Sequence, residues 1–190
     1  MYHIKNDQRS IRSAEMIYEA LTKLIDHQSF GSIKVSQVVE EAQIGRATFY
    51  RNFDMLEDVL RWRADQVVEQ LVIYVAEYRL SQTGSSTVSV LKPVLRFFYL
   101  HSSIVELLIA ANQIDILQKA LQAKLEQATP KSSLSDLPSE YLKYGPVIRS
   151  SVAVHILAHW IKGGKKEAPD ELADSLREMA IQLSGLGMLF

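Results

Sequence analysis

Two short helical patterns occupy the stretch Ser36–Phe53, SQVVEEAQIGRATFYRNF, and the residues Gln43-Ile44-Gly45 separate them. The second pattern has an apolar side, because Phe49 and Phe53 stand one helical turn apart. Its remaining surface carries hydroxyl, guanidinium and amide groups, which come from Arg46, Thr48, Tyr50, Arg51 and Asn52. This distribution predicts a helix of about two turns that is anchored by one side and contacts a polar partner with the other.

The residues before and within this stretch extend it to a unit of three helices. Apolar residues recur at helical spacing from about Ser10 to His27, which predicts an amphipathic first helix. Ser36 is a suitable N-cap residue for the second helix, and its inward side is Val38, Val39 and Ala42. The third helix is expected to open at Gly45 or Arg46, so the chain begins with one helix followed by a helix-turn-helix.

A helix-turn-helix reads double-stranded DNA by laying its second helix in the major groove. Arg46 suits the acceptor pair of guanine, and Thr48 suits a phosphate or a thymine methyl group. The predicted DNA-contacting residues are Ser36, Gln37, Arg46, Ala47, Thr48, Tyr50, Arg51 and Asn52. The alternative is an ordinary helical hairpin, which would also place polar side chains outside and aromatic side chains inside.

The rest of the chain shows helical patterns only, so the fold class is all-α. One long helix is expected from Asp54 to about Leu80, ended by residues 81–86. Shorter helices are expected over residues 87–101, 103–111, 113–128, 139–163 and 169–186, and residues 130–138 are the most loop-like segment. The predicted organisation is a DNA-binding domain over residues 1–53 and a helical effector-binding and dimerisation domain over residues 54–190.

Composition narrows the possible functions. The chain has 190 residues and is 47% hydrophobic, which is enough for a substantial core. With no Cys there is no disulfide and no thiolate nucleophile or metal ligand. The net charge is −1, so any nucleic-acid contact must be local. The sequence shows no signal-peptide pattern, membrane-length apolar run, phosphate-binding loop or nucleophile elbow, so we expect a cytoplasmic protein that is not an enzyme and has no cofactor.

Residues 10–60 resemble the N-terminal domain of the TetR family of bacterial transcriptional regulators. The family has a Thr-aromatic-Tyr-x-x-Phe run in its turn unit, and Thr48–Phe53 fits that run. Val38, Val39, Ala42 and Ile44 fit the positions of the second helix and the turn. The resemblance implies a ligand-responsive homodimer, a repressor, that binds a two-fold symmetric DNA operator and is released by a small-molecule effector.

Three positions depart from the family pattern. Gln43 stands where the family usually has Gly, so a turn with positive φ would cost on the order of 1 kcal/mol. Gly45 replaces the usual Ser or Thr cap, and Leu56 replaces a Lys that meets a phosphate. Acidic residues flank Leu56, namely Asp54, Glu57 and Asp58. These departures leave a second hypothesis open, a coactivator or protein-interaction module with the same fold and weak DNA affinity.

The segment Trp160–Leu172, WIKGGKKEAPDEL, adds a narrower likeness. Its Trp, Gly and Pro pattern is similar to that of TetR-type regulators associated with dihydroxyacetone kinase operons. The same region contains His155 and His159 at i, i+4 on one predicted helix, a spacing that can chelate a metal. Neither a His-Glu-x-x-His motif nor a third ligand accompanies them, so we predict no metal site.

The remaining predictions concern the C-terminal region. Two-fold operators require two reading heads, and in the family the last two helices of each subunit form a four-helix bundle. The predicted dimer-interface residues are Val152, Ile156, Trp160, Leu172, Leu176, Met179 and Leu183, whereas the alternative is that both helices bury only against their own chain. The predicted effector-binding residues, an apolar wall with polar tips, are Tyr78, Phe97, Phe98, His101, Asn112 and His155. Each of these is alternatively an ordinary core residue.

Overall fold

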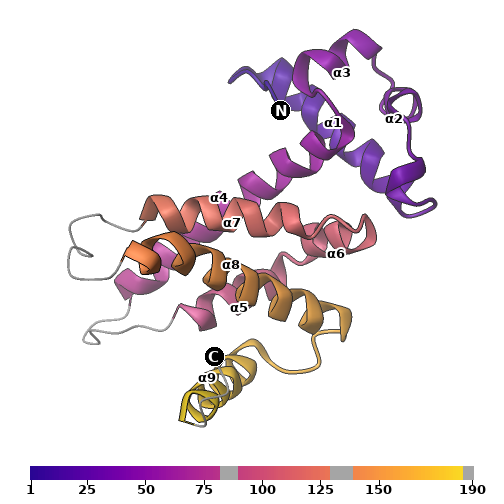
Figure 1. The fold of residues 1–190 in the computed structure, drawn as a ribbon. Coiled ribbons are helices and arrows are strands. Elements are labelled where there is room, and N and C mark those ends of the chain that lie inside the picture. Colours follow the sequence, from indigo (N-terminus) through magenta and orange to yellow (C-terminus); the bar gives the residue numbers. More distant parts are fainter. Residues whose placement is uncertain (82–89, 129–138, 186–190) are drawn as a thin grey trace.

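The computed structural model describes residues 1–81, 90–128 and 139–185, and these ranges are helical with short connections (Figure 1). The elements are α1 (Gln8–Ile25), a 3-10 turn η1 (Phe30–Ser32), α2 (Val35–Glu41), α3 (Arg46–Asn52), α4 (Leu56–Ser81), α5 (Leu91–Leu100), α6 (Ser103–Ala110), α7 (Asp115–Ala128), α8 (Ser139–Lys162) and α9 (Pro169–Gly185). Among the described residues, the extended pairing is a single bridge between Tyr2 and Phe53. The all-α prediction is confirmed.

Most predicted helices agree with the structure to within a few residues, and α2 is the instructive difference. It begins at Val35, so Ser36 lies inside the helix rather than capping it. The backbone N–H of Lys34 donates to Oε1 of Gln37 at 2.8 Å, which satisfies the N-cap position from within the helix. The predicted Ser36 cap is therefore wrong by two residues. The expected starts and ends in residues 82–89 and 130–138 lie outside the described residues.

The three-helix module, which we define as α1, α2 and α3, has its own apolar centre. Ile17 and Leu21 of α1, Val38 of α2 and Phe49 of α3 are fully buried. Phe53 is also fully buried, and its ring lies 5.9 Å from the Phe49 ring. Because side chains from all three helices meet there, the short α2 and α3 are held by tertiary packing rather than by helix propensity.

Helix α4 leaves this module and continues into the rest of the molecule (Figure 1). Its first turns pack on α1, and the Trp62 ring lies 6.0 Å from the Phe53 ring. Farther along, Val68 and Leu71 are buried where α4 packs against α5 and α7. Helix α4 therefore contributes side chains to the cores of both predicted domains, residues 1–53 and residues 54–190.

The C-terminal helices form layers on α4. Helix α7 lies between α4 and α8, whereas α5 packs against α4 on one side and α9 on the other. Figure 1 shows the three-helix module and α9 at opposite ends of the molecule. Two ion pairs fasten α9 to α5: Arg96 donates from Nε to Oδ1 of Asp170 at 2.7 Å, and Lys92 donates to Asp174 at 2.8 Å.

No single helix in the described ranges is long and apolar enough to cross a membrane. Helices α5 and α6 together reach that length and composition, but they are bent by 78° at the break between them.

Candidate nucleic-acid interface

Helix α3 lies with one side in the core and the other in solvent. Phe49, on its inward side, is fully buried, and the ring is edge-on to Tyr50 at 5.4 Å. The outward side exposes Arg46, Ala47, Tyr50 and Arg51, and Tyr50 is 53% exposed. Positions 46, 47, 50 and 51 fall on one face of a helix, because residues four apart lie above one another. Two guanidinium groups and a phenol are thus presented together by an anchored helix.

Asn52 does not belong to this exposed face, and its predicted role in DNA contact is corrected. The residue is fully buried. Its Oδ1 accepts from the Ser10 hydroxyl at 2.8 Å, and its Nδ2 donates to the Thr48 carbonyl at 2.9 Å. Asn52 therefore ties α3 to α1, and its amide is not available to a phosphate or a base.

The other predicted DNA-contacting residues are partly accessible. Ser36, Gln37 and Thr48 are half-buried, and Gln37 already uses Oε1 to accept from the Lys34 backbone. The side-chain amide nitrogen of Gln37 remains as a donor. The structure thus brings Arg46, Tyr50 and Arg51 together on one surface, with Ser36 and Gln37 on the neighbouring helix. Their contact with DNA stays a prediction.

The turn between α2 and α3 has the predicted backbone strain. Gln43 has φ 53°, in the left-handed region that glycine adopts at lowest cost. The N–H groups of Gln43 and Ile44 donate to the carbonyls of Glu40 and Val39 at 3.0 Å, a pattern that closes the end of α2. Gly45 is the N-cap of α3 and supplies no side-chain hydrogen bond. Gln43 thus has the positive φ that was expected to carry a steric cost, and Gly45 leaves α3 without a side-chain cap.

Acidic side chains surround the start of α4, and the structure gives two of them partners. Asp58 is fully buried, accepts from the Met55 backbone at 3.2 Å and pairs with Arg61 at 3.0 Å. The Met1 amino group donates to both Asp58 and Asp54, at 2.6 and 2.9 Å, and His3 also contacts Asp54. These hydrogen bonds, that from Met1 first, hold the pKa of Asp54 below its usual value.

Leu56 is buried, with 8% of its surface exposed, so its side chain makes no contact with a phosphate. Glu57 is half-buried and has no hydrogen-bond or ion-pair partner within the described ranges. Arg61 was a predictable partner for Asp58, because the two residues are three apart on one helix. The contacts of Met1 and His3 were not predictable, because these residues lie more than fifty positions from the carboxylates that they meet.

The predicted effector-binding residues do not line a common cavity. Phe98 lines a void of about 10 Å³ among α4, α5, α7 and α8, too small for an organic ligand. Phe97 is buried against Tyr74 and His101, and Tyr78 receives the Arg96 guanidinium over its ring at 5.6 Å. His155 is exposed on α8. Asn112 lines a separate cavity beside the three-helix module. These six residues belong to five different surroundings, so the structure does not bring them together in one pocket.

The predicted dimer-interface residues include both buried and exposed side chains. Trp160 is only 4% exposed, and its Nε1 donates to the Glu167 carbonyl at 3.2 Å, so the prediction that it forms an interface is corrected. Leu172 and Leu176 pack in part against the chain's own core. Val152 and Met179 are 54% and 53% exposed, and Ile156 and Leu183 are half-buried. Tyr141, Tyr144 and Ile148 are also exposed, and their spacing continues the Val152 side of α8.

The segment with the narrower family likeness is a helix-ending turn. Gly164 has φ 83°, and the N–H of Lys165 donates to the Trp160 carbonyl at 3.0 Å to close α8. Pro169 then begins α9. Turn geometry therefore accounts for the Gly and the Pro of this pattern. In the same region, Nδ1 of His155 contacts the Ser151 carbonyl at 2.8 Å, and no group of three metal-ligating side chains is found among the described residues.

No protein-family model and no curated protein matches the chain. The solved structure of Lin0861 from Listeria innocua is similar over 95% of this chain and 96% of its own, with a TM-score of 0.79 at 17% identity. A transcriptional regulator (TerR/AcrR family) from Aquifex aeolicus VF5 has a TM-score of 0.48 at 17% identity, with 94% and 99% of the two chains covered. The fatty acid degradation regulator FadR from Bacillus halodurans has a TM-score of 0.49 at 15% identity, with 92% and 95% covered.

The similarity to Lin0861 shows that the fold is shared over nearly the whole of both chains. The arrangement itself is the one that the sequence resemblance implied: α1, a helix-turn-helix formed by α2 and α3, the long α4, and a helical domain beyond it. The chain therefore shares the fold of Lin0861, and its helix order is the one that the TetR resemblance predicts.

Proposed function

We propose that the protein is a DNA-binding transcriptional regulator whose α3 reads the major groove. The observation that carries this proposal is the outward face of α3, on which Arg46, Tyr50 and Arg51 stand together while Phe49 anchors the helix. Guanidinium groups suit phosphates and the acceptor edge of guanine, and a tyrosine hydroxyl suits a phosphate. An anchored helix holds these groups in a fixed register, which sequence-specific reading requires.

The proposal includes a homodimer, since one chain supplies a single reading helix. Exposed apolar side chains follow one side of α8 at helical spacing: Tyr141, Tyr144, Ile148 and Val152. Met179 and Ile181 on α9 are also exposed. Large exposed apolar side chains that follow one side of a helix are typical of a protein–protein interface. Two copies joined through α8 and α9 would present two α3 helices to a two-fold symmetric operator.

More specifically, we propose that the protein is a repressor and that a small molecule releases it from DNA. The TetR resemblance implies both properties. We also propose a DNA-binding domain that ends near residue 53, a cytoplasmic location and no enzyme activity. A ligand can change DNA affinity only if it binds one arrangement of the two reading heads better than another. The regulated genes and the subgroup are left open by this proposal, because fold alone does not determine them.

Selection of bound duplexes from a random DNA library tests the proposal. We expect a sequence with two-fold symmetry whose half-sites lie about one helical turn apart. Arg46→Ala and Tyr50→Phe should each weaken binding to the selected duplex without changing the thermal unfolding temperature. Arg79→Ala is the matched control, because Arg79 is exposed near the end of α4, outside α3 and outside the proposed dimer interface. If no sequence is enriched, the proposal fails.

The second candidate is a coactivator or protein-interaction module. It is favoured by the start of α4, where Leu56 is buried and Glu57 is a carboxylate without a partner among the described residues, near the expected phosphate backbone. Such a module would bind DNA weakly by itself and act through a partner protein. Specific operator binding by the purified protein alone would exclude this candidate.

A further inference from the structure

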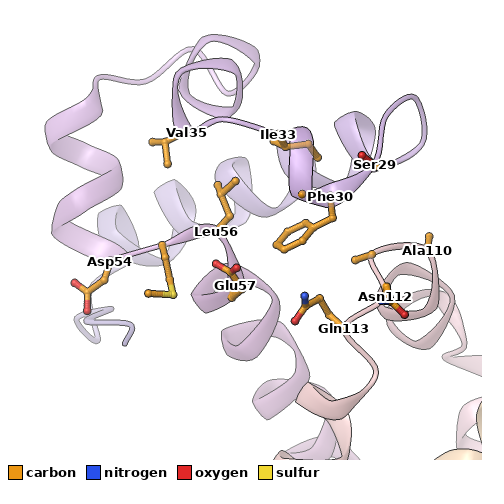
Figure 2. A pocket seen from close by; sticks show the side chains of 13 residues that line it. Ser29, Phe30, Ile33, Val35, Asp54, Leu56, Glu57, Ala110, Asn112 and Gln113 are labelled. Carbon is orange, nitrogen blue, oxygen red and sulfur yellow. The ribbon is translucent and has the colours of Figure 1, made fainter.

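A cavity of about 600 Å³ lies between the three-helix module and the turn that joins α6 to α7 (Figure 2). This volume is within the usual range for small-molecule sites. One wall comes from residues 29–35, which connect α1 to α2, and from residues 54–57 at the start of α4. The opposite wall is residues 110–113. The cavity therefore has the reading module on one side and the C-terminal helices on the other.

Apolar and polar groups meet in this cavity. Phe30, Ile33 and Leu56 are each at least nine-tenths buried and form its apolar surface. Figure 2 shows the Phe30 ring, the Glu57 carboxyl group and the Gln113 amide directed toward the same space. An apolar wall with a small number of polar groups is the usual composition of a ligand site.

The electrostatic character of the cavity is negative. Asp54 and Glu57 both line it, and no basic side chain is among its lining residues in the described ranges. Asp54 is already engaged by the Met1 amino group and His3, whereas Glu57 has no such partner in the same ranges. A positively charged ligand would pair with Glu57, and an anion would be repelled.

The backbone of the wall opposite Glu57 is fixed by the C-terminal end of α6. Asn112 has φ 54°, and its N–H donates to the Ile109 carbonyl at 3.1 Å. The N–H of Gln113 donates to the Leu108 carbonyl at 2.8 Å, which completes a Schellman motif. This motif fixes the backbone of Gln113 at the cavity wall.

We propose that this cavity binds a small organic cation with an apolar body. The ammonium group pairs with the Glu57 carboxylate and donates to the Gln113 carbonyl oxygen, and the apolar body packs on Phe30 and Leu56. Bound in this way, the ligand contacts both walls and favours one placement of the three-helix module relative to α6 and α7. The regulatory consequence rests on the proposed DNA-binding function, whereas the binding itself does not.

Calorimetric titration of the full-length protein without DNA tests the binding. The probes are phenethylammonium and 4-phenylbutylammonium, with 3-phenylpropionate as an anion of similar size. We expect the ammonium probes to bind and the carboxylate not to bind. Failure of both ammonium probes, or equal binding of 3-phenylpropionate, would overturn the proposal.

Two variants locate the site. Glu57→Gln removes the charge, and Gly31→Leu fills the cavity from a position where an added Cβ meets no atom within 4 Å. Each should weaken binding of the ammonium probes by about tenfold or more, which corresponds to at least about 1.4 kcal/mol. Glu178→Gln on α9 is the charge-matched control and should bind as the wild type does. Unchanged affinity in both cavity variants, with thermal unfolding showing that they are folded, would place the probe elsewhere and overturn the assignment.

The proposed effect of the bound cation on DNA affinity is tested separately, with the operator. Saturating ammonium probe should change the operator affinity of the wild type and not that of Glu57→Gln. An unchanged operator affinity with bound probe would overturn the coupling while leaving the binding site and the DNA-binding function intact. If no operator is bound at all, the proposed function fails, and the calorimetric result on the cavity stands independently.

Discussion

Gln43 has a backbone conformation that carries a steric penalty for any residue with a Cβ atom. Gln43→Gly should therefore raise the free energy of unfolding by about 0.5–1 kcal/mol, since the relief of strain exceeds the added entropy of the unfolded chain. A chain of this size would gain about 2–4 °C in unfolding temperature per kcal/mol. Gln43→Ala is the control and should bring no gain. Equal stabilisation by Ala and Gly would contradict the role of φ.

Asn52 provides the opposite case, a residue whose importance is structural. Asn52→Ala removes the hydrogen bonds to Ser10 and Thr48 in a fully buried site, so it should lower the free energy of unfolding by about 1–3 kcal/mol. Chemical denaturation measures this loss. Arg51→Ala on the exposed face should leave stability unchanged within about 0.5 kcal/mol. Destabilisation by Arg51→Ala as large as that by Asn52→Ala would refute the division between anchoring and exposed sides.

For individual residues, the sequence predicted the buried and exposed sides of α3 only in part. Phe49 and Phe53 were identified as anchors from their spacing, and both are buried. Asn52 was assigned to the wrong side, because its polarity suggested exposure. The deciding factor was the Ser10 hydroxyl, which lies 42 residues earlier in the chain and offers Asn52 a partner inside the module.

The contact between α5 and α9 shows how one element is attached to another. Asp170 accepts two hydrogen bonds from Arg96, at 2.7 and 2.5 Å, and these bonds chiefly lower the pKa of the Asp170 carboxyl group. Both side chains are more than 40% exposed, so solvent screening limits the contribution to no more than about 1 kcal/mol. A lowered pKa means that this contribution is complete above the ordinary Asp value near 3.8 and is lost as the pH falls through the folded-state pKa.

Asp170→Asn should therefore destabilise the protein slightly at pH 7, and the difference from the wild type should shrink in acid. Urea unfolding from pH 7 down to the lowest pH at which the protein remains folded measures this trend. Glu178→Gln, an exposed change on the same helix, should show no such pH dependence. A difference that stays constant or grows in acid would contradict the proposed attachment of α9.

Helical periodicity was sufficient to predict the elements, because apolar residues recur at 3.6-residue spacing wherever a helix faces the core. Helix ends were less accurate: α2 is capped through Gln37, a residue that the capping argument did not consider. The packing of the C-terminal helices on one another was not predictable from the sequence. Phe97 and Phe98 are adjacent in sequence, yet Phe97 packs on Tyr74 and His101, whereas Phe98 lines the small void beside α8.

The whole molecule is proposed to act as a dimer through the exposed side of α8. Val152→Glu should convert the dimer to a monomer with unchanged helix content, because it places a charge in an apolar interface. Sedimentation velocity measures the molecular mass. Val72→Glu is a matched control on α4, where the valine is 42% exposed compared with 54% for Val152. A wild-type protein that is monomeric at micromolar concentration, or a dimer that persists in Val152→Glu, would contradict this interface.

The central claim, that α3 reads duplex DNA, is tested most directly by titrating the purified protein with its own upstream DNA and with a scrambled duplex at two salt concentrations. The account predicts tight binding to the upstream DNA, weaker binding to the scrambled duplex and a steep fall in affinity with salt, because phosphate contacts release counterions. Arg46→Ala should reduce the preference between the two duplexes. Equal, weak binding to both would contradict the claim and favour the coactivator.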